Sequence, residues 1–155
     1  MSSTITIRPA TIDDKDFILS MVPRLVEFGP PRWRDKEKLV AFDRKVLDNE
    51  LSNPHGDDAI FVAEENKKKL GFIHVRFGSD YYYKEKHGHV EDLVVAAEGE
   101  GRGVGKLLIK KAEEWARLQG FRWLTLNVFA KNEKARQVYD KLGYGEDILK
   151  YVKEL

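Results

Sequence analysis

The feature that most restricts the fold of this chain is a row of four glycines at alternate positions, Gly99, Gly101, Gly103 and Gly105. The run HVEDLVVA (89–96) before them predicts a strand, and the amphipathic stretch 104–119 after them predicts a helix. Glycine permits left-handed backbone conformations and leaves main-chain N–H groups uncovered. A glycine-rich turn that leads into a helix N-terminus is therefore suited to binding an anion such as a phosphate group.

The spacing of these glycines excludes two common phosphate-binding loops. A Walker A loop needs glycine five residues before its Gly-Lys pair and Ser or Thr directly after it, but Glu100 and Leu107 lie there. A dinucleotide-binding fingerprint needs a small residue where the chain has Lys106 or Val104, depending on the starting glycine. Taken alone, the segment predicts either a general anion site or a flexible turn before a helix.

The rest of the chain predicts a mixed sheet with helices packed on its faces. Thr11 suits the cap of a first helix that Pro23 interrupts, and residues 28–34 break the pattern before the next helix. The order is β-α-α-β-β-β-α-β-α-β. Strands are expected at 4–9, 59–64, 70–78, 89–96, 122–128 and 144–152, and the later helices at 35–51, 104–119 and 133–142.

Composition limits the class of protein. The length suits a single domain over residues 1–155, and 27 basic against 26 acidic side chains give no reason to expect nucleic acid as a partner. The chain has no cysteine, which excludes disulfides, thiolate metal sites and a cysteine nucleophile. The four histidines lack metal-ligand spacing, so no metal is expected. With no leader pattern and no run of about 20 apolar residues, we expect a cytoplasmic protein without a membrane partner.

Two longer segments resemble a known family. VEDLVVAAEGEGRGVGKLLIKKAEEWA (90–116) and LTLNVFAKNEKARQVYDKLGY (124–144) are similar to the acetyl-CoA-binding core of the GNAT N-acetyltransferases. The family's loop reads Arg or Gln, any two residues, Gly, any residue, then Gly or Ala, and residues 100–105 match it except at Glu100. An Asn-x-x-Ala helix start and a tyrosine follow at the family's spacing, and the resemblance extends over about residues 59–150.

The resemblance implies a fold and a cofactor. The fold is the mixed α/β acyltransferase fold, with about six to seven strands flanked by about four helices. The cofactor is acetyl-CoA, used as a co-substrate. The residues expected to bind it are Val94, Val95, Glu100, Gly101, Arg102, Gly103, Val104, Gly105, Lys106, Asn132, Ala135 and Tyr139. Since a carboxylate near a diphosphate is unfavourable, Glu100 is expected to point away, leaving the anion to Arg102, Lys106 and the backbone.

Acetyl transfer to an amine needs a neutral nucleophile, a stabilised oxyanion and a proton for the leaving thiolate. Glu91 or Asp92 is the candidate base, directly or through water. Neighbouring strand residues face opposite sides, so only one is expected to enter the cleft, and the resemblance favours Glu91. Backbone N–H groups around Val94 and Val95 are the expected oxyanion donors. Tyr139 is the candidate acid, because a phenol stays protonated at neutral pH. Solvated carboxylates and a core tyrosine are the structural alternatives.

The acceptor is expected to be a primary amine of a small molecule or peptide. Trp33, Tyr81 and Asn127 are candidates to bind it, because the first two lie in aromatic-rich breaks and the third is a polar residue on a predicted strand. A monomer or homodimer is expected. Two other readings stay open: a non-catalytic acyl-CoA-binding or sensor module, which the unusual Glu100 favours, and a nucleotide-binding protein.

Overall fold

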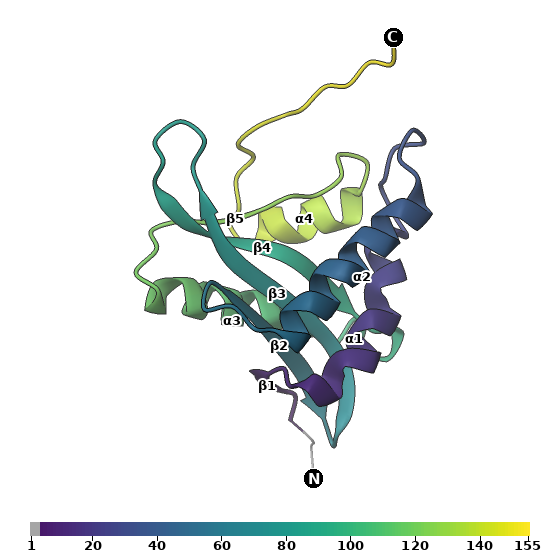
Figure 1. Ribbon diagram of the computed structural model, residues 1–155, viewed down its shortest axis with the longest axis vertical. Coiled ribbons are helices and arrows are strands. Elements are labelled where there is room, and N and C mark those ends of the chain that lie inside the picture. The colour runs from purple at the N-terminus through teal and green to yellow at the C-terminus, as the bar shows by residue number, and fades with distance from the viewer. Residues whose placement is uncertain (1–3) are drawn as a thin grey trace.

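The computed structural model describes residues 4–155, and its centre is a five-stranded sheet in the order β1-β2-β3-β4-β5 (Figure 1). Neighbouring strands are antiparallel from β1 to β4, whereas β4 and β5 are parallel. The strands are β1 (Thr6–Pro9), β2 (Asp58–Glu65), β3 (Lys68–Ser79), β4 (Lys86–Val95) and β5 (Leu124–Leu126). The strands predicted at 59–64 and 70–78 are thus present as β2 and β3, which form a hairpin.

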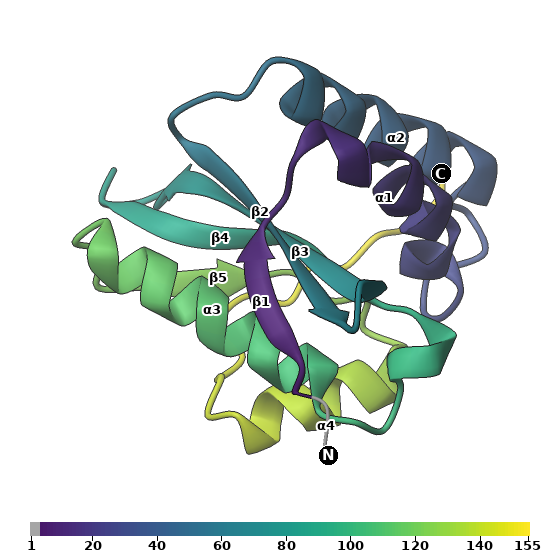
Figure 2. The same cartoon turned by 90° about the horizontal axis from the view of Figure 1, so that it is seen from below.

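Helices cover both faces of this sheet (Figure 2). On one face lie α1 (Lys15–Met21) and α2 (Lys36–Ser52), and on the other lie α3 (Val104–Leu118) and α4 (Glu133–Lys141). Short 3-10 turns complete the chain as η1 (Ile12–Asp14), η2 (Val22–Val26) and η3 (Ala97–Gly99). Pro23 lies in the first turn of η2, where its missing N–H ends the α-helical pattern of α1 as predicted.

Each face has its own apolar core. On the α3 face, Ile73, Val75 and Val90 pack with Leu108 and Ala112 of the helix. The core on the α1–α2 face is smaller, and there Val62, Phe72 and Val94 pack against Ile18 and Leu47. Because Leu108 and Phe72 are fully buried, truncating either to alanine is expected to destabilise the protein by about 2–5 kcal/mol.

A buried carboxylate ties the first strand to the first turn. Asp14 is 1% exposed, and its oxygens lie 2.8 Å from the Arg8 guanidinium and 3.0 Å from Lys69 Nζ. Asp14 also accepts a hydrogen bond from the Thr11 N–H, which completes a capping box. The Arg8 hydrogen bonds outweigh burial and hold the pKa of Asp14 well below its usual range.

Two sequence predictions about the sheet are wrong. The described residues form five strands rather than six to seven, and residues 144–152, expected as the last strand, form none. That segment leaves the body of the molecule, and Ile148, Leu149 and Tyr151 are exposed (Figure 1). Its apolar residues come in adjacent pairs, so apolar and polar residues do not alternate regularly along it. The strand predicted at 122–128 is confirmed only over 124–126.

Candidate active site

A β-bulge in β4 shapes the centre of the candidate site. The pairing of β3 with β4 runs from Val75↔Val90 to His74↔Asp92, which leaves Glu91 as the extra residue. Val90 and Leu93 both pack into the α3-face core although they are three positions apart, and regular alternation cannot place them on one face. The bulge therefore reverses the alternation of β4 at Glu91.

The bulge places two acidic side chains on the α1–α2 face. Val94 packs into the core on that face, so Asp92, two residues earlier on the regular part of β4, points the same way. Glu91 follows Val90, which faces α3, and so points away from α3 as well. Burial raises the pKa of Asp43, on α2, to about 6, and the charges of Asp92 and Glu91 add to this shift. The prediction that only one of Glu91 and Asp92 faces the cleft is wrong.

The two carboxylates differ in their partners. Asp92 is 6% exposed, and its Oδ2 lies 3.3 Å from Nδ1 of the fully buried His74, whose Nε2 lies 2.7 Å from Asp58 Oδ2. Burial lowers the pKa of His74, but the hydrogen bonds and charges of Asp92 and Asp58 outweigh it, so the net shift is upward. Asp92 is therefore committed to a buried ion pair.

Glu91 is the more available carboxylate. Its side chain is 30% exposed, and Oε2 lies 3.6 Å from Arg76 and 3.8 Å from His89 Nε2, both longer than a hydrogen bond. Burial is the main cause that lowers the pKa of His89, with help from the charges of His87 and Arg76. His89 Nδ1 lies 2.7 Å from Thr125 Oγ1 on β5. A neutral imidazole thus lies between Glu91 and the neighbouring strand.

Beyond the bulge, β4 is no longer paired with β5, although it stays paired with β3. The parallel pairing covers only Gly88–Leu124, His89–Thr125 and Val90–Leu126, while β4 continues to Val95. The Ala96 N–H donates to the Leu70 carbonyl on β3, so the main-chain groups of the preceding residue, Val95, face away from β3. The carbonyl of Val95 accepts a hydrogen bond from Arg24 Nε at 2.9 Å. Val95, rather than Val94, therefore presents main-chain groups at the open edge.

The glycine segment forms an exposed turn at this open end. Gly101 and Gly103 have φ of 72° and 79°, and a side chain at either position would meet open space. Gly103 is the N-cap of α3 and supplies no side-chain hydrogen bond, so the first N–H groups of the helix keep free donors. Gly105 lies next to the Val95 side chain: a Cβ added at Gly105 would be 3.6 Å from Val95 Cγ2. Val104, by contrast, is buried in the α3-face core.

The charged side chains around the glycines are mostly paired. Arg102 donates to Glu65 of β2 at 2.6 Å, Glu100 pairs with Arg24 of η2, and Lys106 is exposed in the first turn of α3. The negative charge at Glu100, which the sequence predicts to point away, is thus balanced by a cation from another element. Nothing in the sequence near Arg24 signals this pairing, because the two residues are 76 positions apart.

The second segment that resembles the family includes α4 and its cap. Asn132 caps this helix by accepting a hydrogen bond from the Ala135 N–H at 3.2 Å, as predicted. Tyr139 is half-buried against the α3-face core and meets Tyr144 edge-on, with ring centroids 5.9 Å apart. Burial raises the pKa of the Tyr139 phenol, so its hydroxyl is protonated at neutral pH.

The three residues predicted to bind the acceptor lie in separate places. Trp33 is exposed in the α1–α2 connection, where Gly29 packs against Phe129 and Asn132. Asn127 is exposed one residue beyond β5. Tyr81 is 80% exposed in the turn before β4 begins at Lys86, and β4 itself extends about 30 Å from Lys86 to Val95 at roughly 3.3 Å per residue. The structure therefore brings Trp33 and Asn127 to the α4 side and leaves Tyr81 remote from the glycine turn.

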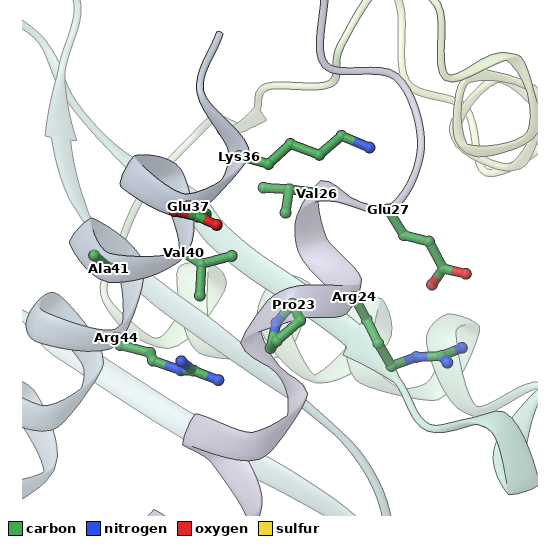
Figure 3. A pocket seen from close by; sticks show the side chains of 9 residues that line it. All are labelled: Pro23, Arg24, Val26, Glu27, Lys36, Glu37, Val40, Ala41 and Arg44. Carbon is green, nitrogen blue, oxygen red and sulfur yellow. The ribbon is translucent and has the colours of Figure 1, made fainter.

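Sequence reasoning missed a groove between η2 and α2 (Figure 3). It has a volume of about 580 Å³. Its lining mixes apolar and charged side chains: Pro23, Arg24, Val26, Glu27, Lys36, Glu37, Val40, Ala41 and Arg44. Within residues 4–155, no three His, Asp or Glu side chains are grouped to hold a metal ion, and no helix has the length and apolar character needed to cross a membrane.

Comparisons with known proteins agree with this geometry. Residues 20–144 match the family described as "Acetyltransferase (GNAT) family". The chain belongs to the GNAT family. An uncharacterized N-acetyltransferase of Methanocaldococcus jannaschii is 30% identical over 144 residues, which cover 92% of this chain and 62% of that relative. The family resemblance is therefore confirmed. The resemblance implies an N-acetyltransferase, and that is the enzyme class in the name of this relative.

Solved structures confirm the fold. A putative acetyltransferase from Pyrococcus furiosus has a TM-score of 0.75 and 25% identity, covering 98% of this chain and all of its own. An aminoglycoside N-acetyltransferase in complex with CoA has a TM-score of 0.74 and 20% identity, covering all of this chain and 98% of its own. The mixed α/β GNAT fold is thus shared, with a sheet smaller than the sequence predicts.

Proposed function

We propose that this protein moves an acetyl group from acetyl-CoA directly to a primary amine of a small molecule or peptide. The observation that supports this most is the parting of β4 from β5 after Val90, next to an α3 N-terminus that has no side-chain cap. An elongated ligand with amide groups fits the open edge of β4, and a diphosphate fits the free N–H groups of α3. The CoA complex of the structurally similar aminoglycoside enzyme supports the same cofactor.

The cofactor-binding residues follow from this placement. The N–H groups of the glycine turn, from Gly101 to Lys106, bind the diphosphate, with the side chain of Lys106 adding charge. Asn132 and Ala135, at the start of α4, contact the pantetheine arm. The Val95 N–H, at the open edge, stabilises the oxyanion on the thioester carbonyl. Because the main chain would make this hydrogen bond, the position needs no polar side chain, and the residue there is a valine.

Glu91 removes the proton from the amine, and Tyr139 returns one to the thiolate. A lysine-like amine, with pKa about 10.4, must be brought to its neutral form at a cost of about 4.6 kcal/mol at pH 7, whereas an α-amine near 7.8 needs only about 1. Glu91 is positioned for this by the bulge, while Asp92 is held by His74. Three carboxylates on the α1–α2 face, at Asp43, Glu91 and Asp92, favour a cationic acceptor.

The test is acetyl-CoA turnover with a panel of amines and peptides, followed by release of free thiol. Tyr139→Phe should lower kcat by about 10²–10⁴ and leave CoA binding intact, since only the proton donor is lost. Tyr151→Phe is the matched control, because Tyr151 is 89% exposed in the C-terminal segment. Unchanged turnover in Tyr139→Phe would remove this residue from the mechanism.

A second candidate is a non-catalytic acyl-CoA-binding or sensor module. Glu100 favours it, because this position of the family's loop usually carries Arg or Gln. CoA binding measured by calorimetry, without thiol release for any acceptor in the panel, would support the sensor over the enzyme. Absence of CoA binding would overturn both.

A further inference from the structure

Arg24 joins two parts of the proposed cofactor site. Its Nε donates to the carbonyl of Val95 at 2.9 Å, and its guanidinium pairs with the Glu100 carboxylate. Arg24 comes from η2, on the other layer of the molecule, and its side chain is only 29% exposed. One side chain therefore spans from the open edge of β4 to the first residue of the glycine turn.

The contact with Val95 is at the edge that a ligand would use. A ligand that hydrogen-bonds to β4 beyond Val90 competes with Arg24 for the Val95 carbonyl. The guanidinium has five N–H donors in a fixed fork, so it can release this carbonyl and still keep Glu100 as a partner. Glu100 lies directly before the exposed Gly101, so an Arg24 held there remains beside the turn.

The surrounding charges leave this cation, together with Lys106, as a partner for an anion. Arg102, the basic residue within the turn, donates to Glu65 at 2.6 Å and is directed toward β2. Glu100 would repel a diphosphate if it stood alone. With Arg24 attached, the pair is neutral, and the guanidinium keeps N–H donors beyond those bonded to Val95 and Glu100.

We infer that Arg24 binds the diphosphate of the cofactor and that Glu100 holds it in place, so a residue of η2 supplies the cation that the glycine turn itself lacks at position 100. This rests on the proposed function, because it assumes that CoA is the ligand. Arg24 is a binding residue for the cofactor and takes no part in proton transfer. Its release from Val95 accompanies cofactor entry.

The test compares CoA and dephospho-CoA, which share the diphosphate, with pantetheine, which lacks it, by calorimetry. Arg24→Gln should weaken the binding of CoA and dephospho-CoA about tenfold, as expected for loss of a charge-assisted hydrogen bond, and should not weaken pantetheine binding. Arg44→Gln is the control with the same charge change: Arg44 lines the same groove and donates to the Leu19 carbonyl instead. It should bind CoA like the wild type.

A double-mutant comparison separates direct binding from simple neutralisation of Glu100. If Arg24 contacts the diphosphate, Arg24→Gln should still weaken CoA binding when Glu100 is already Gln, but by less than tenfold because Glu100 no longer holds the guanidinium in place. No loss in that background would overturn the inference, because Arg24 would then matter only as the counter-charge of Glu100. Equal weakening of CoA and pantetheine would also overturn it.

A third variant guards against loss of folding. Arg24→Lys keeps the charge but loses the fork of donors, so its CoA affinity should lie between those of the wild type and Arg24→Gln. Thermal melting of every variant identifies any that is unfolded. Wild-type protein that binds CoA, combined with an Arg24→Lys variant that is folded but as weak as Arg24→Gln, would refute the role of charge. Failure of the wild type to bind CoA would instead remove the proposed function itself.

Discussion

Asp43→Asn should stabilise the protein at neutral pH. Burial and the charges of Asp92 and Glu91 raise the pKa of Asp43 from 3.8 to about 6 in the folded protein. The folded state therefore holds the proton more tightly than the unfolded chain. Stability is expected to fall as pH rises from about 4 to about 6, and the full penalty remains above that range.

The magnitude follows from the pKa difference. A shift of about 2 units corresponds to about 3 kcal/mol at 1.36 kcal/mol per unit. Because Asp43 is only partly buried, solvent screening reduces this to roughly 1–2 kcal/mol. Asparagine has nearly the same shape and no charge, so the variant should gain that amount at pH 7.5 and little at pH 4.5.

Urea unfolding of wild type and variant at the two pH values measures this directly. Asp147→Asn is the control, because it removes the same charge from the exposed C-terminal segment and should give no pH-dependent difference. An Asp43→Asn variant whose stability relative to wild type is the same at pH 4.5 and 7.5 would show that burial and the neighbouring carboxylates do not raise the pKa of Asp43.

Two further predictions concern the frame around the site. Asp14→Ala should destabilise the protein by about 3 kcal/mol in urea unfolding, because Arg8 and Lys69 lose a buried partner; Asp13→Ala, at an exposed neighbour, should change stability far less. Deleting residues 147–155 should leave the melting temperature unchanged, since the segment is exposed throughout. A marked drop in melting temperature after this deletion would contradict the description of the segment as unpacked.

The sequence was sufficient for the elements with a strong period or clear caps. The helix predicted at 104–119 is found at Val104–Leu118, and the one predicted at 133–142 is Glu133–Lys141 with Asn132 as its cap. In both, the apolar spacing and the glycine that follows are local signals. The prediction of a strand at 144–152 was wrong. A short, apolar-rich stretch forms a strand only where a neighbouring strand is available to pair with it.

Two parts of the site depend on contacts that no local pattern reveals. The bulge at Glu91 arises from the pairing of β4 with β3, and the sequence HVEDLVV gives no sign that one residue is left out. Arg24 and Glu100 meet across two layers of the fold. The glycine turn, by contrast, was predictable, because glycine at positive φ is a requirement of the backbone itself.

The extra residue in β4 also decides which changes in length this strand can accept. Loss of the single codon for Glu91 would restore regular alternation, and Asp92, Leu93 and Val94 would keep their present faces and their partners on β3. Loss of the codon for Leu93 would instead move Val94 to the α3 face and Val95 to the α1–α2 face. A descendant of this gene could therefore lose the proposed base in one step and keep its core, whereas a deletion two codons later would disturb both cores.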